Sequence, residues 1–411
     1  MKIRLLNLSL RAFTLAVKFA FILSLAVFLP PAEVGLYGLI TVTVFFSIYF
    51  VGFEFYTYST RDMVARPRNE WPGLLSSQLV FFLLMYLLVL PISSLLFWVG
   101  ILPWTILVYF LLLVVLEHLS TELMRLLVAA EKPLLATVII FVKQAGWAIC
   151  FIFAMWMNPD FRNISDLLLF WVIGVISSLV IGARPLLQLN WSGALARINW
   201  RWIRNGVLIA LPLLLSSIAV RSLFTFDRYA FEALNGLELL GAYSVYMGVA
   251  SAMLSFMESG IFVFYYPKMM KAYKENQLHV FREAFKKLTK QSALWLLVLM
   301  AGAGLAGLVI FPLLEEGVYA ENLPLFASTI ITMAVFIFGY VFQYGLYAAT
   351  RDGSIIFANV AGLALAVMVL VLLAPYLEYW AVTISMLAGS IAATTLKYWK
   401  WLATQRALSL S

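Results

Sequence analysis

The sequence predicts an all-α polytopic membrane protein with about twelve transmembrane helices in two parallel six-helix lobes. Its 411 residues are 64% hydrophobic and only 12% charged, with a mean hydropathy of +0.97. Soluble domains are about half apolar and about a quarter charged. Many apolar segments reach the ~20 residues that a helix needs to cross ~30 Å of hydrocarbon. These segments are continuous rather than alternating, which predicts helices and not a β-barrel.

Twelve apolar segments follow one another along the chain. Their approximate ranges are 12–29, 36–57, 74–98, 103–127, 134–156, 166–187, 206–226, 239–264, 291–313, 325–349, 355–374 and 379–399. The first segment follows a basic N-terminus and ends at Pro30 and Pro31. It is longer than the apolar core of a signal peptide, so we expect it to be a retained helix.

Basic residues are distributed unequally between the two sides of this predicted bundle. If the N-terminus, the even-to-odd connections and the C-terminus share one side, that side holds 23 of the 28 Lys and Arg residues. The opposite side holds only Arg162 and Arg228, and three more lie well inside spans, away from their ends. The positive-inside rule therefore predicts a multi-pass protein of the bacterial cytoplasmic (inner) membrane with both termini in the cytoplasm. The net charge of +8 indicates this orientation and contact with anionic membrane lipids rather than nucleic acid.

A short motif occurs twice, half a chain apart. PAEVGLY contains Gly35 and Tyr37, and the same Gly-x-Tyr spacing returns at Gly241 and Tyr243, 206 residues later. Six spans before and six after the midpoint give both halves the same orientation, which is a parallel repeat. We therefore expect an N-terminal six-helix lobe at 1–188, a cytoplasmic linker at 189–205 and a C-terminal six-helix lobe at 206–411.

The longest predicted cytoplasmic connection, 268–290, has its own periodicity. Apolar residues recur there at helical spacing among Lys and Arg: Leu278, Phe281, Phe285 and Leu288. This pattern favours an amphipathic helix on the membrane surface, and the alternative is a solvated connector.

Three basic residues lie more than one helical turn from either end of a predicted span, where a charge is costly and marks a functional hypothesis. They are Lys18, Lys143 and Arg221. Arg221 shares a helical face with Arg228 and has no acidic residue on that face within one turn. It therefore requires a partner on another helix, a water-filled cavity or an anionic ligand. The predicted substrate-binding residues are Arg221, Arg228, Lys18 and Lys143.

Two acidic residues are predicted to couple transport to an ion. Glu258 lies within the span 239–264, and Glu54 lies near the end of the span 36–57. Structural alternatives stay open for most of these charges. Glu258 could pair with a basic side chain, and Lys18 and Glu54 could extend to the interface.

Lys143 could pair with Glu117 on the neighbouring span. His118, Glu122 and Arg125 share one helical face and are more simply explained as a structural ion-pair ladder.

The sequence contains no recognisable catalytic motif. There are two histidines, no cluster with metal-ligand spacing and no G-x-x-x-x-G-K-[ST] loop, and the single cysteine cannot form an internal disulfide. The predicted outer connections have about a dozen residues at most. We therefore expect neither an enzyme nor a bound metal or cofactor.

Two segments carry a resemblance to a known family: PAEVGLY at 31–37 and FDRYAFEALNGLELLGAYSVY at 226–246. With its length, span count and two-lobe repeat, the chain resembles the oligosaccharide-lipid flippases. These form the polysaccharide transporter branch of the multidrug/oligosaccharidyl-lipid/polysaccharide exporter superfamily. One departure is that Lys18 stands where early helices of the family often carry arginines, and cationic positions are sparse.

The resemblance implies a substrate and a mechanism. Such a flippase moves an undecaprenyl-pyrophosphate-linked oligosaccharide repeat unit across the membrane by alternating access, for O-antigen, capsule or exopolysaccharide synthesis. Candidate partners are then the polysaccharide polymerase and the glycosyltransferases of that synthesis. Two alternatives remain: a multidrug-type, cation-coupled antiporter of small molecules, and a membrane polysaccharide polymerase or ligase.

Overall fold

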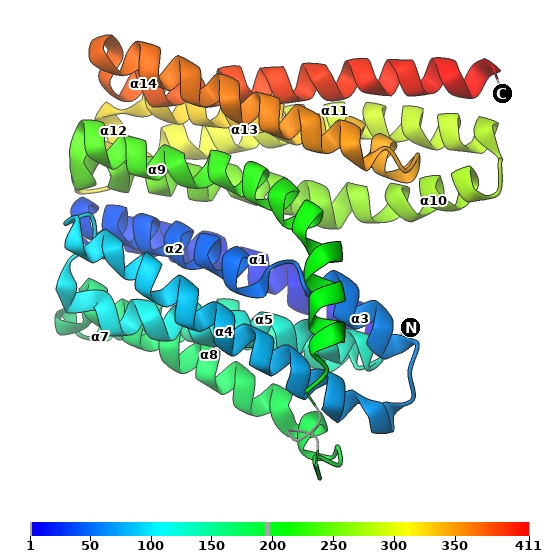
Figure 1. Ribbon diagram of the computed structural model, residues 1–411. Coiled ribbons are helices and arrows are strands. Elements are labelled where there is room, and N and C mark those ends of the chain that lie inside the picture. Colours follow the sequence, from blue (N-terminus) through cyan, green and yellow to red (C-terminus); the bar gives the residue numbers. More distant parts are fainter. Residues whose placement is uncertain (1, 194–197, 411) are drawn as a thin grey trace. The chain divides into compact units, whose positions relative to one another are not determined.

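A computed structural model describes residues 2–193 and 198–410. Residues 194–197 of the predicted linker lie outside the described residues. Every regular element of the described residues is helical, as Figure 1 shows. This confirms the all-α class. Helices satisfy their backbone hydrogen bonds internally, which hydrocarbon requires of a spanning segment.

The helices of the N-terminal half match the first six predicted spans. Those that reach span length, alone or in combination, are α1 (Lys2–Phe28), α2 (Pro31–Gly52), α4 (Trp71–Trp98), α5 (Leu107–Ala129), α6 (Pro133–Phe141) with α7 (Trp147–Met157), and α8 (Ile164–Leu187). A short helix, α3 (Tyr56–Val64), connects α2 to α4. Between α6 and α7 the chain forms a π-helical turn, η3 (Val142–Gly146). Single 3-10 turns, η1 (Arg68–Glu70), η2 (Trp104–Ile106) and η4 (Pro159–Phe161), connect the others.

The C-terminal half contains two helices that are too long for one crossing. These are α9 (Trp200–Met257) and α14 (Asp352–Leu410), with 58 and 59 residues. Each would be nearly 90 Å long if straight, about three times the hydrocarbon thickness. The backbone breaks at Gly236 (φ 78°) in α9 and at Glu378 (φ 43°) in α14. Each long helix therefore accounts for two of the predicted spans.

The remaining elements of this half are shorter. They are the π-helical turn η5 (Glu258–Phe262), α10 (Val263–Lys274), α11 (Leu278–Ile310), the 3-10 turn η6 (Phe311–Leu313), α12 (Val318–Glu321) and α13 (Leu323–Ala348). Ten helices of the described residues are long and apolar enough to cross a membrane. Two of these ten are the broken helices, so about twelve spans in two groups agree with the prediction.

The chain divides into two compact units. The first contains residues 1–24 and 39–218, and the second contains 25–38 and 219–411. The second unit therefore includes the end of α1 and the first eight residues of α2, together with the C-terminal half. The unit boundary within α9 falls between Ile218 and Ala219. We describe each unit separately.

The repeated glycines meet each other within the second unit. A Cβ atom added at Gly241 would lie 2.7 Å from the carbonyl carbon of Pro31, and one added at Gly35 would lie 3.1 Å from that of Leu237. Both distances are to backbone atoms, so the start of α2 and the second part of α9 touch directly. Small residues permit such close approach of helices in membranes. The glycines of both Gly-x-Tyr copies therefore allow the two helices to pack closely.

The periodic segment 278–288 forms the first part of α11 and is continuous with the following span. Its apolar residues are buried within the protein: Phe281 and Leu288 are fully buried and Phe285 is 8% exposed. The Phe285 ring lies 4.1 Å from that of Trp401 on α14. The predicted amphipathic helix exists, but its apolar face packs against α14, so the expected role as a separate surface helix is wrong.

Candidate functional site in each unit

The first unit contains a polar pocket of about 250 Å³. Tyr49 and Glu54 line it from the end of α2 and the turn that follows, and Arg125 lines it from α5. Lys143 and Gln144 line it from the π-helical turn η3. Glu54 and Lys143, predicted from sequence for ion coupling and substrate binding, thus lie on one pocket. Both assignments remain predictions.

Lys143 is buried in a hydrogen-bonded network. Its Nζ donates to Glu117 Oε2 at 2.7 Å and to Thr121 Oγ1 at 3.1 Å. Trp171 Nε1 donates to the other Glu117 oxygen at 2.8 Å. The Lys143 and Glu117 residues are 6% and 1% exposed. The pairing left open by the sequence is therefore present, and it compensates two charges that would be costly to bury alone.

The π-helical turn positions Lys143. A turn with i→i+5 hydrogen bonds is rare and frequently marks a functional site. Here it brings the backbone carbonyl of Lys143 to 2.8 Å from Trp147 Nε1, which donates to it. No periodicity in the sequence distinguishes this turn from ordinary α-helix.

Glu54 lies in a strained turn. Phe53 and Glu54 both have a φ of 54°, in the left-handed region that non-glycine residues rarely adopt. Two such residues in succession between α2 and α3 require support from their surroundings. Phe55, the next residue, is fully buried and stacks on Phe81 at 4.7 Å. This packing holds Glu54 at the pocket.

Arg125 is a pocket residue that the sequence suggested only as part of an ion-pair ladder. It forms an ion pair with Glu122, three residues earlier on α5. Its guanidinium carbon lies 3.5 Å above the centre of the Tyr56 ring. Burial raises the pKa of the Tyr56 hydroxyl, Glu54 adds to this effect and Arg125 opposes it. Of the expected ion-pair ladder, the pair between Glu122 and Arg125 is therefore present.

His118 does not join that ladder. Its Nδ1 lies 2.6 Å from the Tyr86 hydroxyl oxygen, on α4, while His118 itself is fully buried. Its Nε2 is buried without a hydrogen-bond partner among the described residues. The shared helical face in the sequence therefore does not make one network.

Lys18 lies on α1 and its side chain is exposed. It interacts electrostatically with Glu117 and Lys143, but it does not line the polar pocket. Its predicted role in binding substrate remains untested.

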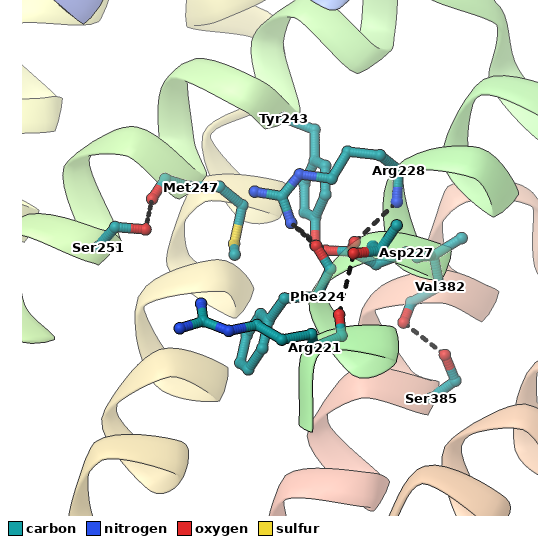
Figure 2. Close-up of polar contacts among 10 residues, drawn as sticks. Arg221, Phe224, Asp227, Arg228, Tyr243, Met247, Ser251, Val382 and Ser385 are labelled. Atoms are coloured by element: carbon teal, nitrogen blue, oxygen red, sulfur yellow. Dashed lines mark hydrogen bonds and ion pairs between the residues drawn. The ribbon is translucent and has the colours of Figure 1, made fainter. Parts of the chain in front are cut away.

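The second unit contains a charged cluster around Asp227, drawn in Figure 2. Asp227 is fully buried in α9. Arg228 Nη1 donates to Asp227 Oδ2 at 2.6 Å and to the Phe224 carbonyl oxygen at 3.1 Å. The Tyr243 hydroxyl donates to the same Asp227 oxygen at 2.8 Å. Asp227 and Tyr243 lie on opposite sides of the break at Gly236, so this cluster joins the two parts of α9.

The Tyr243 ring adds a stacking contact to this cluster. It lies parallel to Phe231 with a centroid distance of 4.6 Å and an angle of 4°. The Asp-Arg-Tyr segment and the second Gly-x-Tyr motif, which carried the family resemblance, therefore form one packed unit around Asp227. Arg228, predicted to bind substrate, has a side chain that is 12% exposed and paired.

Replacing Tyr243 by phenylalanine tests this arrangement. The change keeps the stacking on Phe231 and removes one hydrogen bond to a buried carboxylate. Hydrogen bonds to charged groups contribute about 1.5–3 kcal/mol, so a clear loss of thermal stability is expected. Tyr376→Phe, at a tyrosine of α14 that is 80% exposed, is a control on the same residue type and should leave the melting temperature unchanged. A melting temperature for Tyr243→Phe equal to that of the wild type in detergent would contradict the assigned role.

Arg221 and Glu258 lie elsewhere in the second unit. Arg221 is exposed, and in Figure 2 its guanidinium group lies away from the Asp227 carboxylate. Glu258 is also exposed, at the start of the π-helical turn η5, and it interacts electrostatically with Arg221. Each unit thus has a π-helical turn that carries an ionisable residue: Lys143 in the first and Glu258 in the second.

Sequence reasoning also missed the burial of a lysine. Lys397 on α14 is 2% exposed, and its Nζ donates to Gln343 Oε1 at 2.8 Å. The sequence analysis counts it with the basic residues of the cytoplasmic side. Only its position just inside an apolar run could have suggested otherwise. Among residues 2–193 and 198–410, no group of three or more His, Cys, Asp or Glu side chains could hold a metal ion.

Comparisons with known proteins give a fold but no family. No family model matches the chain, and no curated protein matches it. Solved structures do match over nearly the whole length. One is described as the inward-facing conformation of a multidrug resistance MATE family transporter of the MOP superfamily; it is 11% identical, with a TM-score of 0.76, over 98% of this chain and 99% of that chain.

Two further structures have the same fold. The outward-facing conformation of a multidrug resistance MATE family transporter is 13% identical, with a TM-score of 0.58, over 99% of this chain and 96% of that chain. A MOP superfamily transporter from Pyrococcus furiosus Vc1 (DSM3638), titled for the reverse polarity of its binding pocket, is 14% identical, with a TM-score of 0.60, over 98% and 93%. The chain therefore has the fold of the MATE transporters of the MOP superfamily.

Proposed function

We propose that this protein is a membrane transporter that works by alternating access. The observation that carries the proposal is the match of 98–99% of the chain to transporters solved in both inward-facing and outward-facing conformations. A chain with this fold has the architecture that alternating between inward-facing and outward-facing conformations requires. We place it in the cytoplasmic membrane with both termini in the cytoplasm, from the distribution of its basic residues.

The substrate that we propose is an undecaprenyl-pyrophosphate-linked oligosaccharide, for synthesis of a surface polysaccharide. Two cations, Arg125 and Lys143, line the polar pocket beside one carboxylate, Glu54. The Lys143 partner Glu117 and the Arg125 partner Glu122 do not line this pocket. Guanidinium and ammonium groups are the usual ligands of phosphate. The two motifs that resemble the flippase branch support the same choice.

A multidrug-type, cation-coupled antiporter is the second candidate. The matched structures favour it, because two of those reported above are described as multidrug resistance transporters. In that case Glu54 and Glu258 would be the residues that exchange the coupling cation. The same matches do not favour a polymerase or ligase.

The two candidates differ in what reconstituted protein should move. Proteoliposomes with a fluorescent lipid-linked oligosaccharide in one leaflet should lose protection from a membrane-impermeant quencher if the protein is a flippase. Proteoliposomes loaded with a cationic dye should export it along an opposing ion gradient if the protein is an antiporter. Dye export without lipid translocation would replace our first candidate with the second.

Arg221 provides a test of the predicted binding residues. A guanidinium binds phosphate through two parallel hydrogen bonds, which an ammonium cannot do. Under the flippase proposal, Arg221→Lys should insert normally and translocate the lipid poorly, and Arg221→Ala should abolish translocation at normal abundance. Membrane abundance and surface polysaccharide should be measured together. Full polysaccharide from both variants would exclude Arg221 as a substrate contact.

A further inference from the structure

The first unit contains a second pocket, which is mainly apolar and has a volume of about 240 Å³. We call it the apolar pocket. It lies among α3, α4, α5 and α8 and extends over about two helical turns of α4, from Leu75 to Phe82. Leucines of α5 and α8, such as Leu119 and Leu179, form much of its wall. A hydrocarbon chain fits such a lining because both surfaces leave water on contact.

Two polar atoms in this wall have no hydrogen-bond partner within the described part of the chain. They are Ser59 Oγ and Gln78 Oε1, and these residues are 0% and 5% exposed. The Gln78 amide nitrogen donates to Glu122 at 3.0 Å, which fixes the orientation of its side chain. Leaving a buried polar group without a partner costs about 1–3 kcal/mol. The Ser59 hydroxyl can donate to a ligand oxygen, so a phosphate next to an apolar chain would remove that cost for Ser59.

Arg125 lines both pockets of the first unit. Its ion pair with Glu122 uses Nη1, and its guanidinium plane is held over Tyr56. The side chain is 27% exposed. The nitrogens other than Nη1 make no hydrogen bond to the residues described, so the guanidinium has donors left for an anion. Arg125 therefore stands at the boundary between an apolar space and a polar one.

We infer that the apolar pocket binds part of the hydrocarbon chain of a polyprenyl-linked phosphate, and that Arg125 binds the phosphate at the head of that chain. The polar pocket beyond Arg125 then receives the polar group attached to the phosphate. A free phosphate would not use the apolar pocket, and a membrane phospholipid would not need a second pocket of 250 Å³. This inference rests on the proposed flippase function and identifies where its substrate is bound.

The test uses the purified full-length protein and farnesyl phosphate as the probe. Ala183 lines the apolar pocket on α8, and Ala183→Trp fills the space. Val180 on the same helix is 70% exposed and does not line the pocket, so Val180→Trp is the matched control. Ala183→Trp should weaken farnesyl phosphate binding at least tenfold, while Val180→Trp should leave it unchanged. Equal affinities for the two variants would overturn the proposed chain site.

The phosphate contact is tested separately. Loss of a hydrogen bond to a charged group reduces affinity about tenfold or more, so Arg125→Gln should bind farnesyl phosphate more weakly by that factor. The same variant should bind farnesol, which has no phosphate, as the wild type does. Arg125→Lys should retain part of the affinity, provided that the melting temperatures of the variants match. Displacement of the probe by phosphatidylglycerol at equal concentration would instead identify a general lipid site and contradict the inference.

Failure of the inference differs from failure of the proposed function. If the protein translocates the lipid-linked oligosaccharide but Ala183→Trp binds the probe normally, the function stands and the site is wrong. If the probe binds with the expected variant pattern but no lipid is translocated in proteoliposomes, the site stands and the function is wrong.

Discussion

Gly241→Leu is expected to remove most of the folded protein from the membrane, and Gly241→Ala should lower its melting temperature clearly. The Cβ atom of either variant would overlap backbone atoms of Pro31 at the start of α2. Neither helix can relieve this overlap by rotating a side chain, so the helices must move apart. Overpacking of this kind costs about 1–3 kcal/mol for small additions and more for large ones.

A matched control is Gly304→Ala. Gly304 is also helical, in α11, and a Cβ atom there would meet no neighbour within 4 Å. Because alanine favours helix over glycine by about 1 kcal/mol, this control should not lose stability. Membrane abundance and melting temperature, measured by fluorescence-detected chromatography, compare the variants. Wild-type stability of Gly241→Ala would show that the two helices do not touch as described.

Lys143→Met should destabilise the first unit by about 3–5 kcal/mol, because it leaves the carboxylate of Glu117 buried without its cation. Glu117→Gln should be damaging for the converse reason. The double variant Glu117→Gln with Lys143→Met should recover most of the abundance. Its glutamine oxygen can still accept from Trp171, and no unpaired charge remains.

The double variant also separates structure from function. If the only role of Lys143 is to pair with Glu117, the double variant should recover transport together with stability. If Lys143 also contacts substrate, the double variant is stable but transports poorly. A double variant that is no more stable than Lys143→Met alone would mean that the two charges do not compensate each other, against the 2.7 Å contact.

The helical fold was predictable because hydrophobicity alone determines how many segments can enter a membrane. The start of a helix is also readable where a proline stands at its first turn, as at Pro31 and Pro133. The breaks in the long helices were less clear. Gly236 is a residue that a turn favours, but Glu378 adopts a positive φ that its side chain disfavours. Pro375, three residues earlier, indicates an interruption nearby, but no residue type marks the break at Glu378 itself.

The candidate sites were less predictable than the fold. Charges at membrane depth could be named from the sequence, and Lys143 and Glu54 do lie on one pocket. Which partner each charge has depends on contacts between helices, so Asp227 with Tyr243 and Lys397 with Gln343 could not be deduced. The apolar pocket could not be predicted either, because leucines that line a pocket and leucines that face lipid look the same in the sequence.

The two π-helical turns have a consequence for how chains of this fold should be aligned. A π-helical turn accommodates one residue more than an α-helical turn, which shifts the angular phase of everything after it by about 100°. Trp147 directly follows the first turn and packs against Gly174 of α8. A homologue that lacks the extra residue would present a different side chain to that glycine. Single-residue gaps at 142–146 and 258–262 should therefore be treated as changes of helical phase, which alter which residues of α7 and α10 face the protein interior.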